Sequence, residues 1–201
     1  MIKKLNLGSG EFKKQGYLNA DINPLTKPDF LIDLNDLRQY KLFKDNDFDE
    51  IWCEHLLEHL DKPFLIMKEL HRMLKPGGRL IIRVPHFSRG FSHSEHAHGF
   101  DVGFPFYFNP TFTTSGYFGI PFELKNMKMR WMIRFDLKEK VVPGWTIVPL
   151  KIMNVSVSLL ANLNPYFCSR FWCYLVGGFE EIEFVFVKPL SHSRIMANII
   201  S

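Results

Sequence analysis

The residues best suited to chemistry lie where short apolar runs end. Gly8-Ser9-Gly10 follows the first apolar run, residues 3–7, and Asp21 lies at the end of the next, residues 16–22. A glycine turn lets the backbone approach a ligand closely because no Cβ intrudes. A carboxylate at the adjacent strand end accepts charge-assisted hydrogen bonds from both hydroxyls of a ribose. The pair predicts a nucleoside-binding site.

The spacing of this pair disfavours a dinucleotide. The dinucleotide fingerprint requires a third glycine three places after Gly10, where the chain has Lys13, and an acidic residue about 20 residues on. Asp21 follows Gly10 by only 11 residues. A bound pyrophosphate also needs a full helix N-terminus after the turn, and this segment is too short to supply one. A nicotinamide dehydrogenase is therefore a weaker interpretation.

Further polar residues follow the next three apolar runs. Asp33 ends the run 29–34 and is placed to accept from an adenine amino group while Leu34 contacts the ring. Glu54 and His55 follow the run 48–53, and His86 follows the run 79–84. A histidine with a pKa near neutrality is a suitable general base for an alcohol acceptor. Because ligands bind at the carboxyl ends of parallel strands, His86 is the leading candidate for this base.

A histidine-rich segment comes next, with His93, His96 and His98 close to Glu95 and Asp101. His96 and His98 with either carboxylate would make a nitrogen and oxygen ligand set for a transition metal. Because no CxxC or HExxH pattern supports it, we predict no metal site and expect this loop to contact the substrate. His96 could then share the role of base with His86.

The elements that position these residues alternate between strand and helix. Strands are expected at 3–7, 16–22, 29–34, 48–53 and 79–84, forming a parallel sheet covered on both faces. Between the last two, Asp61 as N-cap and Pro63 in the first turn predict a helix that ends at the sequence LysProGlyGly. Two late strands are expected at 127–137 and 180–190.

The rest of the second half is less regular. Residues 151–163 place Ile152, Val155, Leu159 and Leu163 on one face of a helix. The aromatic segment 103–110 has three possible uses: stacking on a sugar, lying in a membrane interface beside Lys125, Lys128 and Arg130, or filling the core. Residues 191–201 are expected to be a loosely held tail.

Length and composition limit the class of protein. A chain of 201 residues suits one domain, which we place at 1–190, with a cofactor-binding half at 1–88 and acceptor-binding elements at 89–190. The formal charge of +4 comes from dispersed lysines and arginines, so no nucleic acid partner is expected. Three cysteines without a CxxC pair suit a cytoplasmic, reducing compartment. The apolar stretch 144–163 contains Pro149, Lys151 and Asn154, so we expect no transmembrane segment, although peripheral membrane contact is allowed.

Five segments together resemble the class I S-adenosylmethionine-dependent methyltransferases: LNLGSG, YLNADI, FLIDL, FDEIWCEHLLEHL and ELHRMLKPGGRLIIRVPHF. The short link between Gly10 and Asp21 is similar to a small branch associated with glycan and polysaccharide synthesis. The resemblance implies an α/β, Rossmann-like, doubly wound fold in three layers, α/β/α. Its seven-stranded sheet would be mostly parallel with an antiparallel last strand.

The resemblance also implies roles for residues. Those expected to bind S-adenosylmethionine are Leu7, Gly8, Ser9, Gly10, Asp21, Ile22, Asn23, Asp33, Leu34, Glu54 and His55. Gly8 and Gly10 would face the methionyl part, and Glu54 and His55 would lie near the transferred methyl group. The candidate catalytic residues are His86, His55, Glu54 and His96. The first turn departs from many members of the family by having two glycines rather than three.

The leading functional hypothesis is an O-methyltransferase that acts on a sugar hydroxyl of a glycan or of its nucleotide- or lipid-linked precursor, with a deoxysugar such as rhamnose as one candidate. A second hypothesis keeps the reaction but has a lipid or small-molecule acceptor. A third is a non-catalytic scaffold domain within a larger glycan-building protein.

Overall fold

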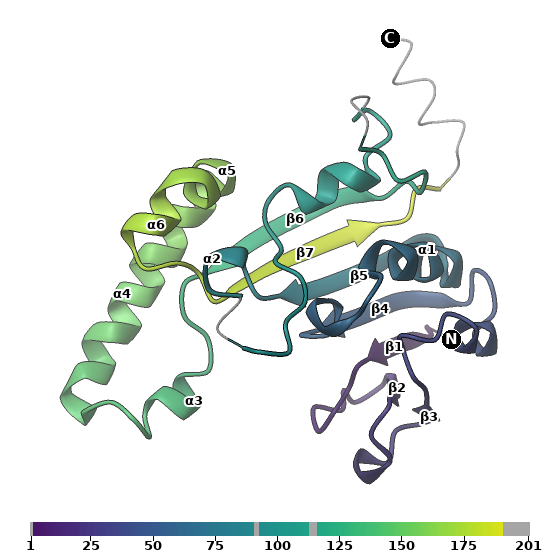
Figure 1. Cartoon of the computed structure of the whole chain (residues 1–201), viewed down its shortest axis with the longest axis horizontal. Helices are drawn as coiled ribbons and strands as arrows, with labels where there is room; N and C mark the ends of the chain where they lie inside the picture. Colours follow the sequence, from purple (N-terminus) through teal and green to yellow (C-terminus); the bar gives the residue numbers. More distant parts are fainter. Residues whose placement is uncertain (1, 91–92, 113–115, 191–201) are drawn as a thin grey trace.

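The protein is built around one seven-stranded sheet in the order β3-β2-β1-β4-β5-β7-β6 (Figure 1). The computed structural model describes residues 2–90, 93–112 and 116–190, and the predicted tail at 191–201 lies outside them. The strands are β1 (Lys4–Leu7), β2 (Leu18–Asp21), β3 (Phe30–Leu31), β4 (Phe48–Glu54), β5 (Leu74–Val84), β6 (Glu123–Arg130) and β7 (Glu181–Val187).

The first five strands are parallel, and β7 pairs antiparallel with both β5 and β6. This confirms the predicted Rossmann-like sheet with its antiparallel last strand. β6 begins at Glu123, four residues before its prediction, and ends at Arg130 rather than at residue 137. It stops early because the backbone N–H groups of Trp131 and Met132 donate to side chains of a helix instead of to a strand.

The helical elements are mostly short. They are η1 (Pro24–Thr26), η2 (Gln39–Leu42), η3 (Leu57–His59), α1 (Pro63–Met73), α2 (Phe87–Gly90), η4 (Phe104–Phe108), α3 (Phe135–Lys138), α4 (Gly144–Leu163), α5 (Pro165–Phe167), the π-helical η5 (Cys168–Trp172) and α6 (Cys173–Leu175). α1 is the helix predicted between the fourth and fifth strands, with Pro63 in its first turn and its end before Lys75. The N-cap is Lys62, so the prediction of Asp61 is wrong by one residue.

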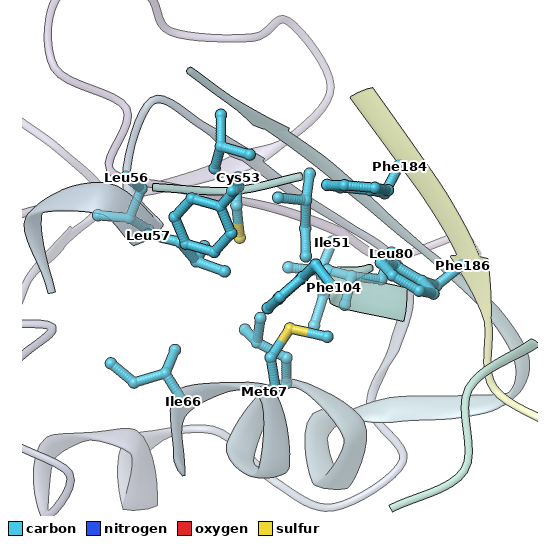
Figure 2. Packing of buried hydrophobic residues seen from close by; sticks show 14 of the residues in the cluster. Ile51, Cys53, Leu56, Leu57, Ile66, Met67, Leu80, Phe104, Phe184 and Phe186 are labelled. Carbon is cyan, nitrogen blue, oxygen red and sulfur yellow. The ribbon is translucent and has the colours of Figure 1, made fainter. Parts of the chain in front are cut away.

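One face of the sheet carries the hydrophobic core. Ile51, Leu80 and Phe184 point from three neighbouring strands toward Met67 of α1, and Phe104 of η4 lies among them (Figure 2). Phe104 and Phe108 are buried, and each ring lies within 6.4 Å of Phe186. Much of the predicted aromatic segment therefore fills the core.

The other face of the sheet is polar and less covered than predicted. Glu50, Trp52 and Glu54 alternate along β4 with core residues, and Glu50 and Glu54 lie opposite Arg79 and Arg83 of β5. In the described part of the chain, the connections from β1 to β3 contain no α-helix, only turns and η1. Because parallel sheets are normally covered on both faces, ion pairs here take the place of a helical layer.

α4 turns its polar face toward the protein and its apolar face toward solvent, which is the reverse of the usual packing of a surface helix. Its polar stripe of Asn154, Ser158 and Asn162 faces the protein and accepts hydrogen bonds from the backbone N–H groups of residues 132, 131 and 129. Leu159 and Leu163, from the predicted apolar face, are 65% and 81% exposed. By length and composition α4 is long and apolar enough to cross a membrane, but its polar stripe holds it against the end of β6.

Loss of this polar stripe should destabilise the fold. Asn162 accepts from Met129 N at 2.8 Å and donates to Met129 O at 2.8 Å, so Asn162→Ala leaves two buried backbone groups unpaired. We expect the free energy of unfolding to fall by about 1–3 kcal/mol, measured by urea denaturation. The control Leu159→Ala, on the exposed face of the same helix, should change it by less than about 0.5 kcal/mol. A larger loss of stability for Leu159→Ala than for Asn162→Ala would contradict this packing of α4.

Candidate functional site

The glycine turn after β1 depends on the absence of side chains at two positions. Gly8 and Gly10 have φ angles of +66° and +46°, a region that other residues rarely adopt. A Cβ at Gly8 would lie 2.9 Å from Cδ1 of Leu56, whereas nothing lies within 4 Å of one at Gly10. The turn is thus packed on one side and leaves open space at Gly10.

Asp21 joins this turn to the end of β2. Its carboxylate accepts from Gly10 N at 2.7 Å and from Asn23 N at 2.8 Å. Because each carboxylate oxygen has a second lone pair, Asp21 keeps the capacity to accept from two ribose hydroxyls. Ser9 Oγ is buried and has no hydrogen-bond partner among the described residues. The open space at Gly10, the charged acceptor and the unpartnered hydroxyl fit the nucleoside and methionyl parts of S-adenosylmethionine.

The other predicted cofactor residues fall into two groups. Ile22 is exposed, Asn23 caps η1 through Leu25 N at 3.0 Å, and Asp33 accepts from Asn35 N at 2.9 Å. These three lie at the surface where a ligand can reach them. Leu7 and Leu34 are part of the core, so Leu7 offers only its backbone, and the side chain of Ile22, unlike that of Leu34, is exposed.

His55 lies just beyond β4 in an unusual backbone conformation, with φ +50°. Its Nδ1 is 3.2 Å from Glu58 Oε1 and its Nε2 is 3.2 Å from Glu181 Oε2. Burial alone would lower the pKa of His55, but the hydrogen bonds to these two carboxylates outweigh it and raise the pKa to about 9. His55 is therefore protonated at neutral pH, which suits a positioning cation better than a general base.

A series of ion pairs continues from His55 along the same edge of the sheet. Glu181 contacts Arg130, Arg130 and Arg83 both contact Glu183, and Arg83 contacts Glu54 at 3.1 Å. Burial opposes ionisation of Glu54, but hydrogen bonds from Trp52 and Arg83 lower its pKa overall. Glu54 is thus a fixed anion near the glycine turn, where Lys14 Nζ also approaches it at 3.6 Å.

His86 is enclosed, which corrects its assignment as the leading base. Its side chain has no exposed surface, Nδ1 lies 2.7 Å from Ser88 Oγ, and Nε2 lies 3.0 Å from Ser169 Oγ. Burial lowers the pKa of His86 to about 4, with Asp101 opposing and Arg170 reinforcing the shift. The ring is a neutral link between the end of β5 and η5, and it presents no nitrogen to an acceptor.

The structure instead places His96 beside η3. The His96 ring stacks on His93 at 4.8 Å and contacts the His59 ring edge to face at 4.8 Å. The backbone N–H of Ala97 donates to the carbonyl of Glu58 at 2.9 Å. The histidine-rich loop therefore lies against η3, just beyond the end of β4.

A pocket of about 360 Å³ lies next to this loop, lined by Pro63, Phe64, Phe87, His98, Gly99, Phe100, Asp101, Phe104 and Tyr107. Its walls are largely aromatic, and its polar groups include Asp101 and His98, whose Nε2 has no partner among the described residues. Apolar walls with a few polar groups are typical of small-molecule sites. We call it the acceptor pocket.

Sequence reasoning missed Glu181 and Lys14 and gave Glu58 little weight. Glu181 and Glu183 alternate with apolar residues in β7, a signal of one polar face, but only the pairing with β5 and β6 brings them to His55. Glu58 lies one turn from His55 yet is fully buried. A buried carboxylate is hard to recognise from sequence because its environment is made by distant segments.

Comparisons with known proteins agree with this geometry. Residues 15–82 match the family described as "Methyltransferase domain". This segment runs from the turn before β2 to the middle of β5, so it includes Asp21, Asp33, Glu54 and His55. No curated protein matches the chain.

Solved structures show the same fold at low identity. The protein bound to the Haloferax volcanii Trm112 methyltransferase activator is 18% identical, with a TM-score of 0.56 over 95% of this chain and 83% of its own. A SAM-dependent methyltransferase from Archaeoglobus fulgidus is 14% identical, with a TM-score of 0.56 over 93% and 86%. The [4+2]-cyclase SpnF is 12% identical, with a TM-score of 0.52 over 94% and 76%.

These neighbours establish the fold, whereas SpnF shows that the fold alone does not fix the reaction. The activity class comes from the family match together with the glycine turn and the strand-end carboxylates. The comparisons support an S-adenosylmethionine-dependent methyltransferase: residues 15–82 match a methyltransferase domain, the whole chain has the fold of such enzymes, and S-adenosylmethionine is the cofactor that they imply.

Asp21 offers a direct test of the cofactor site. Each hydrogen bond to a charged group is worth about 1.5–3 kcal/mol, so Asp21→Asn should weaken S-adenosylmethionine and S-adenosylhomocysteine at least about 100-fold. Isothermal titration calorimetry measures both. Asp36→Asn, at a partly buried aspartate that pairs with Arg38, is the control and should bind normally. Unchanged affinity in Asp21→Asn would remove this residue from the site.

The buried His86 should make the fold sensitive to mild acid. Its pKa is about 4 when folded and 6.5 in the unfolded chain, so only the unfolded state gains a proton between these values. Stability is complete above pH 6.5 and is lost as pH falls toward 4. From pH 7.5 to 5 we expect a loss of roughly 2 kcal/mol, measured by urea denaturation. His86→Gln should remove that part of the pH dependence; an unaltered dependence would refute the assignment.

Proposed function

We propose that the chain transfers the methyl group of S-adenosylmethionine to a sugar hydroxyl of a lipid-linked glycan precursor. Asp21, Ile22, Asn23 and Asp33 would hold the nucleoside, and the glycine turn with Glu54 would hold the methionyl part. The cofactor, when bound, would supply a methyl group on a sulfonium; the acceptor oxygen would attack this methyl carbon in line, lose its proton to solvent, and release S-adenosylhomocysteine. Holding the two in line can supply roughly 7–11 kcal/mol of the barrier.

The proposal of a lipid-linked acceptor rests on an exposed apolar surface over α4, α5, η5 and α6. These elements stand together beyond the ends of β6 and β7 (Figure 1). The apolar surface comprises Trp145, Val148, Ile152, Met153, Val155, Leu159, Leu160, Leu163, Tyr166, Phe167, Phe171, Tyr174 and Leu175, each at least 41% exposed. Contiguous exposed apolar patches mark interaction sites.

Its composition favours a membrane surface over a protein partner. A long helix with an exposed apolar face and a tryptophan near its end has features of an interfacial helix. Trp145 is 81% exposed at the start of α4, and Lys151, beside the apolar face, pairs with Glu139 at 2.6 Å. We infer a peripheral association, with the cofactor site on the cytoplasmic side.

The apolar surface adjoins the acceptor pocket. Phe106 of η4 stacks on Tyr166 of α5 at 5.7 Å, and Arg170 Nη1 of η5 contacts Asp101 Oδ2 of the pocket wall at 3.1 Å. A lipid tail on this surface would bring its sugar head group close to the pocket. Aromatic walls with Asp101 and His98 suit a sugar, since rings pack against its apolar face and polar groups accept or donate to its hydroxyls.

Transfer of labelled methyl groups tests this proposal. With labelled S-adenosylmethionine, we expect turnover with saccharides attached to a polyprenyl phosphate in anionic vesicles, and much less with the same saccharides free of lipid. Ile152→Ser combined with Leu159→Ser should abolish vesicle binding and reduce turnover with the lipid-linked acceptor. Cofactor affinity should stay unchanged, which controls for folding.

Three outcomes would contradict the proposal. Equal turnover with free and lipid-linked saccharides would show that the acceptor does not need a lipid or a membrane. Turnover only with lipids or with quinols and phenols would replace the sugar acceptor by a lipid or small molecule. Tight cofactor binding without turnover on any acceptor would make the chain a scaffold domain of a larger glycan-building protein.

A further inference from the structure

We propose that Glu58, His59 and His96 bind a divalent transition-metal ion beside the acceptor pocket. One ligand atom from each residue lies within 4.8 Å of the others. Glu58 and His59 come from η3 and His96 from the loop after β5, so the three are brought together only by the fold. They differ from the pair His96 and His98 weighed from the sequence.

Glu58 carries the strongest signal. It has no exposed surface, and its Oε2 has no hydrogen-bond partner among the described residues. Its Oε1 faces His55 Nδ1 at 3.2 Å. An unsatisfied buried polar atom costs roughly 1–3 kcal/mol, and more when it is charged. A cation at Oε2 would satisfy this oxygen.

The imidazole of His59 is already oriented for coordination. His59 Nδ1 lies 3.3 Å from the carbonyl oxygen of Glu95, which accepts only if Nδ1 carries the hydrogen. That tautomer leaves Nε2 of His59 as the nitrogen with a lone pair. Metal-binding histidines typically use this arrangement, in which the second ring nitrogen donates to a carbonyl or carboxylate. His96 is held by its stack on His93 and by its backbone N–H, which donates to the His93 carbonyl at 3.2 Å.

Two imidazoles and one carboxylate suit first-row transition ions and leave open coordination positions. This site would deepen the proposed function, on which its chemical role rests. A sugar hydroxyl bound to the ion would lose its proton to solvent more readily. Its oxygen would form the new O–CH₃ bond as the S–CH₃ bond breaks, releasing S-adenosylhomocysteine. The ion would thus do what the enclosed His86 cannot.

Metal binding can be tested without cofactor or acceptor. We would strip the folded protein with EDTA, titrate it with Co²⁺ and follow visible d–d absorption, with Zn²⁺ as competitor. We expect one Co²⁺ per chain. His96→Gln, in a surface loop, should weaken binding by more than the roughly 10–100-fold that loss of an outer-shell partner costs. Glu58→Gln should do the same. His71→Gln, on α1, is the matched control and should bind normally.

The result that overturns the site is equal Co²⁺ affinity in the wild-type protein and a folded His96→Gln, or no binding of Co²⁺, Zn²⁺ or Mn²⁺ by the wild-type protein. Thermal unfolding shows whether Glu58→Gln has folded, and His96→Gln decides the outcome if it has not. Because the readout needs no acceptor, Co²⁺ binding without sugar methylation would support the metal site and contradict only the proposed substrate.

Discussion

The geometry of the candidate site depends on one imidazole, that of His55, which is held between two carboxylates at the carboxyl ends of the strands. Glu58 and Glu181 are both buried and belong to segments more than 120 residues apart. Two carboxylates at such a dry position repel each other. Protonated His55 contacts both, and it thereby fixes η3 relative to β7. The glycine turn is linked to this point through Leu56, which packs against Gly8.

The parts predicted well from sequence are those set by local residues. The glycine turn, Asp21 and α1 follow from short motifs whose conformations are determined nearby. The role of His86 was predicted from its place after β5, but Ser169, 83 residues away, encloses it. The packing of α4 could not be predicted either, because its polar stripe pairs with backbone groups of β6 rather than with water. Such long-range partners leave no local signal.

The short link between Gly10 and Asp21 contains no helix, so side chains of neighbouring strands and turns hold the glycine turn in place. Without a helix in this connection, the turn lacks the packing that a crossover helix provides. Lys14 instead lies 3.8 Å from the Trp52 ring centroid, and Asn19 Oδ1 accepts from both Asn6 Nδ2 and Lys14 N. Side chains on the polar face of the sheet therefore support the glycine turn.

The stripe of Asn154, Ser158 and Asn162 also bears on self-association. The outermost strand of an open sheet presents unpaired backbone groups, and these can recruit a strand from another molecule. β6 occupies that position here. Asn162 pairs with both backbone groups of Met129, and Ser158 and Asn154 pair with residues 131 and 132, so a foreign strand could not pair with the end of β6 without displacing α4. The same helix that exposes an apolar face thus covers the end of this edge strand.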